Sequence, residues 1–118
     1  MNSVRRHRYA QYPAAMGELS KAVLDAMVEE ATVDAYDEGE QLSGFYTMLE
    51  EHLCLPFVTQ VLGVEVTVAD IDLTDDNCVV AICVRDGFRQ AIPVLELPLP
   101  TPAPEGAEWI AAYRHWLG

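Results

Sequence analysis

Acidic side chains gather in a helical stretch of the sequence that runs from Val33 to Phe57. At about 100° per residue, one narrow face of this helix is apolar. That face carries Ala35, Leu42, Tyr46, Leu49 and Leu53. The adjoining face carries four oxygen-bearing side chains, which are Asp34, Asp37, Glu38 and Gln41. Such a face is either a site for a hard cation, which prefers oxygen ligands, or simply a solvated helix surface with acids favoured near the helix N-terminus.

A second acidic stretch, from Asp70 to Asn77, is predicted to be a polar connection between two strands. It does not match an EF-hand loop that begins at Asp70. The chain has Asp75 where the EF-hand requires glycine, and Ala81 where it requires glutamate. A cation site that uses this stretch would therefore be composite, with ligands from elements that are remote in sequence.

The periodicity of apolar residues predicts the elements that must hold these side chains. Helical patterns cover residues 17–55, with either a bend or a break between two helices near Thr32 and Val33. Alternating or continuous apolar runs then predict short antiparallel strands within 57–97, including a tight hairpin at Asp86-Gly87 and a last strand near Val94–Leu97. A proline-rich connector, 98–104, leads to a short amphipathic helix at 105–117.

These elements predict a single α+β domain over residues 17–118, preceded by a flexible basic leader at 1–16. The fold expected is an N-terminal helix or helix pair, a sheet whose strands are short enough to curl into a small barrel at 57–97, and a short C-terminal helix. No apolar run approaches the about 20 residues that span a bilayer, and no secretory signal is recognised. We therefore expect a cytoplasmic protein.

The charge of the chain is strongly negative and limits its partners. There are 19 Asp plus Glu residues against 7 Lys plus Arg, which gives a formal net charge of −12. Such a protein repels nucleic acid and anionic membranes, and it attracts cations or a basic protein partner. The alternative is that the acidic composition only keeps a small protein soluble.

Catalytic constellations are not recognised in the sequence. Ser43 has no nucleophile-elbow motif around it, and the histidines (His7, His52 and His115) are scattered. The glycines are dispersed and form no phosphate-binding loop. We expect that the protein is not an enzyme.

Three separated blocks of the sequence resemble the small cyanobacterial-type calcium-binding proteins. These blocks are VDAYDEGEQLSGFYTMLEEHLCLPF, FRQAIPVLEL and EWIAAYRHWL, and they occur in the family's order. The resemblance covers roughly residue 31 to the C-terminus. It implies an antiparallel SH3-like β-barrel between a long helix and a short one, and calcium binding by acidic side chains without an EF-hand.

The resemblance also implies which residues bind the metal. Asp34, Asp37 and Glu38 lie in the matched helix block, and Asp75 and Asp76 lie where the family has an acidic loop between strands. This loop carries fewer acidic residues here than in the family. The resemblance nevertheless predicts a non-catalytic calcium buffer or sensor that uses these five side chains. The alternative is a metal-independent protein-interaction module of the same fold.

Overall fold

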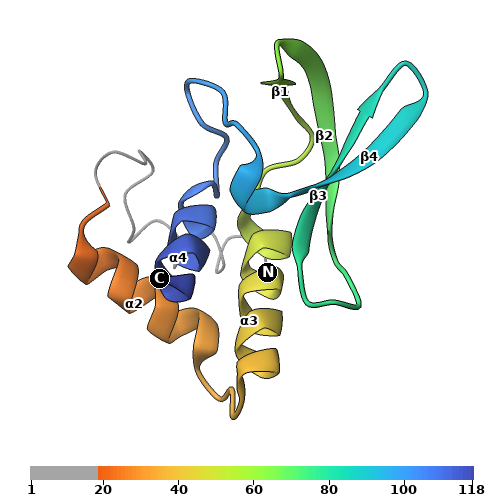
Figure 1. The fold of residues 1–118 in the computed structure, drawn as a ribbon. Helices are drawn as coiled ribbons and strands as arrows, with labels where there is room; N and C mark the ends of the chain where they lie inside the picture. The colour runs from red at the N-terminus through yellow and green to blue at the C-terminus, as the bar shows by residue number, and fades with distance from the viewer. Residues whose placement is uncertain (1–18) are drawn as a thin grey trace.

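The computed structural model describes residues 19–118, so the leader predicted at 1–16 lies outside the described residues. Figure 1 shows three helices beside one end of a curved sheet. The elements in order are α2 (Lys21–Thr32), α3 (Glu38–His52), β1 (Phe57–Val61), β2 (Val64–Leu73), β3 (Val79–Arg85), β4 (Phe88–Pro93), the 3-10 turn η2 (Val94–Glu96) and α4 (Glu108–Leu117). The predicted α+β class is confirmed. No helix within 19–118 is long and apolar enough to cross a membrane.

The helical region is a pair of helices, which was one of the two predicted arrangements. The second helix starts only at Glu38, because the side chain of Asp37 accepts a hydrogen bond from the backbone of Glu40 and caps the helix there. Between the helices, Asp34 adopts a left-handed conformation with a φ of 66°. A continuous helix from Val33 onward was therefore a wrong prediction.

The four strands form one antiparallel sheet in the order β1-β2-β3-β4. Both residues of the predicted Asp86-Gly87 turn have positive φ, as a tight hairpin of this kind requires. Among the described strands β1 and β4 are the sheet edges and do not pair, so the sheet is open and the SH3-like barrel is not confirmed.

Two details of the strand region differ from the predictions. Strand β2 continues to Leu73, so Asp70 and Asp72 belong to a strand and the connection to β3 is shorter than expected. The last strand expected at Val94–Leu97 is instead the 3-10 turn η2, since Pro93 ends β4 and lacks the N–H needed to continue a ladder.

The main core lies where the three helices meet the base of the sheet. Phe45 of α3 and Trp109 of α4 are almost completely buried there. Two polar contacts fix α4 against the other helices: Trp116 Nε1 donates to Gln41 Oε1 at 3.1 Å, and His115 Nε2 lies 2.7 Å from Asp25 Oδ1. The core thus holds the start of α3 in a fixed position relative to the C-terminal helix.

Candidate metal centre

The first turn of α3 uses its acidic side chains partly for capping. Asp37 Oδ1 accepts from the backbone N–H of Glu40 at 2.8 Å, and Glu40 Oε1 accepts from the backbone N–H of Tyr36 at 2.6 Å. This reciprocal pair resembles a capping box and fixes the helix start. It leaves Glu38, the first residue of the helix, exposed to solvent.

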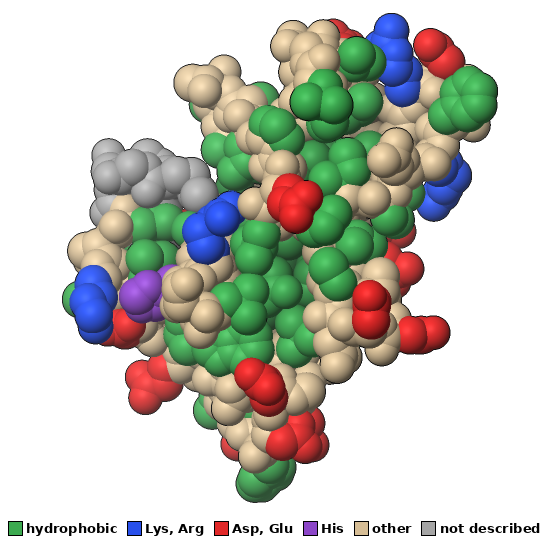
Figure 2. Space-filling view, viewed as in Figure 1, with side chains coloured by type: hydrophobic (Ala, Val, Ile, Leu, Met, Phe, Trp, Pro, Cys, Tyr) green, Lys and Arg blue, Asp and Glu red, His purple; other side chains and the backbone are tan. Residues whose placement is uncertain are grey.

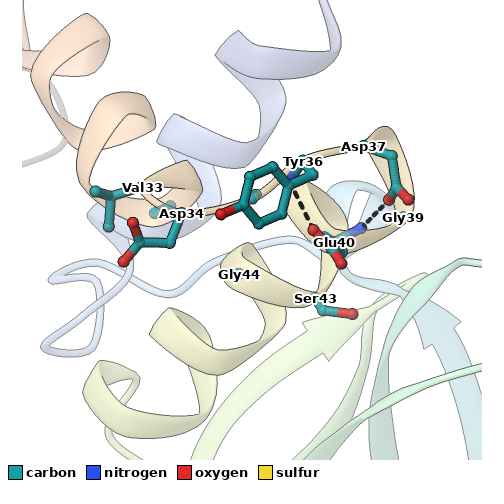
Figure 3. A pocket seen from close by; sticks show the side chains of 10 residues that line it. Val33, Asp34, Tyr36, Asp37, Gly39, Glu40, Ser43 and Gly44 are labelled. Carbon is teal, nitrogen blue, oxygen red and sulfur yellow. Dashed lines mark hydrogen bonds between the residues drawn. The ribbon is translucent and has the colours of Figure 1, made fainter.

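Asp34 is separated from the other acidic residues of this region. Figure 3 shows Asp34 and Asp37 on opposite sides of the Tyr36 ring, with their carboxylates pointing away from each other. Both line an open cavity of about 480 Å³ between the linker and α3. The prediction that they share one helix face is wrong, because the linker breaks the helix between them.

The close approach of α2 and α3 beside this cavity depends on a glycine. A Cβ placed on Gly44 would lie 2.0 Å from the carbonyl oxygen of Ala31. The last turn of α2 can therefore reach α3 only because residue 44 has no side chain. Gly44 thereby sets where the 33–37 linker leaves the helix pair.

The turn between β2 and β3 holds the other predicted ligands. Asp75 and Asp76 are both exposed. The Thr74 hydroxyl donates to Asp76 Oδ1 at 2.5 Å and accepts from the backbone N–H of Cys78 at 3.1 Å. The hydrogen bond from Thr74 lowers the pKa of Asp76 below its ordinary value. Asp76 is therefore a carboxylate at neutral pH and available as an anionic ligand.

The structure brings the start of α3 and the β2–β3 turn together. Glu38 and Asn77, which follows the two turn aspartates, line the same cavity of about 190 Å³. Aromatic side chains from α4 close its inner side. In Figure 1 the turn lies beside the first turns of α3. Two segments that are far apart in sequence thus line one cavity, in which Glu38 is the acidic side chain.

The five predicted carboxylates do not converge on one point. Within residues 19–118, no group of three or more Asp, Glu, His or Cys side chains is placed to hold a metal ion. Carboxylates alone, in the positions seen here, do not make a closed cation cage.

A further acidic group combines Asp70 and Asp72 of the predicted acidic stretch with Glu50 of α3, which the sequence analysis did not associate with them. The Tyr46 hydroxyl of α3 donates to Glu50 Oε2 at 3.4 Å, and burial followed by the nearby charges of Glu50 and Asp72 raises the pKa of Tyr46. Asp70 also contributes to that shift. The sequence signal was the alternation of Asp70 and Asp72 with buried Ile71, which is typical of one exposed strand face.

Comparison with known proteins gives one finding. A family model described as calcium binding, of the CcbP type, matches residues 25–117, which is more than half of the chain. No curated protein and no solved structure matches the chain.

Proposed function

Because the chain belongs to the CcbP-type calcium-binding family, we propose that it is a non-catalytic calcium buffer or sensor of the cytoplasm, with one composite site between α3 and the β2–β3 turn. Calcium is the ligand that the family description gives. The observation that carries the location is the cavity that Glu38 shares with Asn77. This cavity lies between the start of α3 and the β2–β3 turn, which are the two acidic segments that the proposed site combines.

The donor set at this location suits calcium. In the two segments Asp37, Glu38, Asp75 and Asp76 offer hard anionic oxygens, and Asn77 offers an amide oxygen. No three of these acidic side chains are placed to hold an ion in the calcium-free structure, so calcium would have to draw them together. Calcium takes about six to eight oxygens and accepts backbone carbonyls and waters among them, so a few carboxylates are enough. Two of the carboxylates already have one oxygen engaged, Asp37 in the helix cap and Asp76 in the turn.

Asp34 has a smaller role in the proposed site than the other four carboxylates. Its carboxylate points away from Asp37 across the Tyr36 ring, so it reaches a shared cation only after the 33–37 linker rearranges. Such a rearrangement breaks the hydrogen bonds that the backbone N–H groups of Ala35 and Tyr36 make in the linker. We therefore assign Asp34 a supporting role and the four other carboxylates the main one.

Direct titration tests the proposal. We expect a saturable heat when calcium is added in the calorimeter at physiological magnesium and salt, together with a rise in the melting temperature. Binding to the folded state alone stabilises by RT ln(1 + [L]/Kd), about 2.7 kcal/mol at a calcium concentration of 100 Kd. If millimolar calcium produced no heat and no change in the melting temperature, that result would contradict the proposed function.

A further inference from the structure

The linker between α2 and α3 presents two large apolar side chains to solvent. Val33 is 66% exposed and Tyr36 is 90% exposed. Both line the open cavity of about 480 Å³ that Asp34 and Asp37 also line, and Glu40 of α3 lines it as well. We call these five residues and their cavity the linker surface. Exposed apolar side chains gathered at a cavity are typical of a surface that contacts another molecule.

Hydrogen bonds hold the linker surface in shape and leave its carboxylates open. The backbone N–H of Tyr36 donates to Glu40 Oε1 at 2.6 Å, and Asp37 Oδ1 accepts from the backbone N–H of Glu40 at 2.8 Å. The second oxygen of each carboxylate has no hydrogen-bond partner among residues 19–118, and neither has the Asp34 carboxylate. The surface is therefore preorganised for a ligand, which lowers the entropy cost of binding.

The linker surface is negatively charged, and none of the described residues that line it is basic. The sequence has no Lys or Arg between Ala22 and Val84. Lys21 lies at the other end of α2, about 16 Å of helix away, and is already paired with Asp25 at 2.8 Å. Figure 2 shows Asp and Glu side chains at the lower end of the molecule, where Figure 1 has this linker, with no Lys or Arg among them. The potential at the linker surface therefore attracts cations.

The geometry of the linker surface favours several cationic side chains over one metal ion. The carboxylates of Asp34 and Asp37 point away from each other on opposite sides of the Tyr36 ring (Figure 3). No three Asp, Glu, His or Cys side chains of the described chain are placed to hold an ion. An arginine side chain, in contrast, stacks on a tyrosine ring and pairs with a carboxylate at the same time. Two anionic groups separated by an aromatic ring thus suit a segment with more than one arginine.

We propose that the linker surface binds an arginine-rich segment of a partner protein. One guanidinium of that segment stacks on the Tyr36 ring and pairs with Asp34. A second guanidinium pairs with the open oxygens of Asp37 and Glu40, and an apolar side chain covers Val33. The net charge of −12 attracts this occupant, whereas it repels nucleic acid, anionic lipid and a second copy of the chain. A small polyamine is also attracted, but it has no guanidinium to stack on the ring.

This inference does not rest on the calcium proposal, and labelled peptides test it without calcium. We expect fluorescein-labelled octapeptides that alternate Arg with Leu to bind in EDTA, as measured by fluorescence anisotropy. Peptides with Lys in place of Arg should bind about threefold more weakly, because an ammonium group forms no bidentate pair, and peptides with Gln should not bind. Since no calcium is present, a failed calcium titration and a failed linker surface are distinguishable.

Two double variants locate the binding. Tyr36→Ser with Asp34→Asn should weaken the Arg peptide by about tenfold or more. The matched control is Phe88→Ser with Asp86→Asn, which removes an aromatic side chain that is 79% exposed and an exposed carboxylate from the β3–β4 hairpin. The control should change binding by less than about twofold. Both aspartates have positive φ, which asparagine adopts readily, so both variants are expected to keep the fold.

An equal loss of binding in the two double variants would show that net charge alone attracts the peptide, and would overturn the proposal. Equal binding of the Lys and Arg peptides, no binding at about 1 mM peptide, or release of the peptide by an equimolar amount of spermine would overturn it as well. Self-association in sedimentation that the linker variant abolishes would assign the surface to a second copy of the chain instead.

Discussion

Replacing one acidic residue on each side of the proposed centre, as Glu38→Gln with Asp76→Asn, is expected to remove nearly all of the stabilisation by calcium. The two residues come from α3 and from the β2–β3 turn, so their joint loss breaks a composite site on both sides. If the affinity falls about 100-fold, calcium at 100 times the wild-type Kd stabilises by only about 0.4 kcal/mol instead of about 2.7 kcal/mol. Melting curves with and without calcium measure this difference.

The substitutions are chosen to leave the calcium-free fold intact. Asparagine at position 76 keeps an oxygen that can accept the Thr74 hydrogen bond, and Glu38 is exposed at the start of α3. The matched control is Glu65→Gln with Asp86→Asn, which neutralises two exposed carboxylates beside the two hairpin turns of the sheet. If the control loses as much of the calcium effect as the site variant, general charge attraction, and not this site, binds the metal.

Gly44→Ala is expected to cause the largest loss of stability of any single methyl addition to α3. The new Cβ would lie 2.0 Å from the Ala31 carbonyl oxygen, so α2 and α3 must separate. Overpacking of this kind costs about 1–3 kcal/mol, and a backbone neighbour cannot rotate away as a side chain can. Because the 33–37 linker leaves from this contact, calcium affinity should fall as well. Urea unfolding and calcium titration measure the two effects.

Gly39→Ala is the control for this prediction, since it adds the same methyl group to the same helix. The nearest atom to a Cβ at position 39 is Asp37 Oδ1 at 3.5 Å, which is an ordinary contact. Alanine is a better helix former than glycine by about 1 kcal/mol, so this variant should be neutral or more stable. Equal stability of the two variants would show that the α2–α3 contact does not depend on residue 44.

The sequence predicted the Asp86-Gly87 hairpin and the C-terminal helix because each has a strong local pattern. For residues 17–55 it left a bent helix and a helix pair as alternatives. It misplaced Asp34 and Asp37 because a helical projection assumes that the helix continues. The spacing of Asp37 and Glu40 is itself a capping signal and would have placed the helix start at Glu38. Similarly, the alternation around Ile71 shows that β2 includes Asp70 and Asp72.

The proximity of Glu38 to the β2–β3 turn has no local signal in the sequence. It arises because α3 and α4 pack against the base of the sheet and bring the turn beside the first turn of the helix. The open edge between β1 and β4 likewise depends on how far the sheet curls. Patterns within one segment predict the element, but its distant neighbours follow from tertiary packing.

A crystal structure of the protein grown with calcium tests the location of the metal most directly. We predict anomalous density for one ion between the first turn of α3 and the β2–β3 turn, with oxygens of Glu38 and Asp76 at about 2.3–2.6 Å from it. Density instead at the Glu50, Asp70 and Asp72 face, or no ordered calcium at concentrations that saturate the calorimetric signal, would contradict the site.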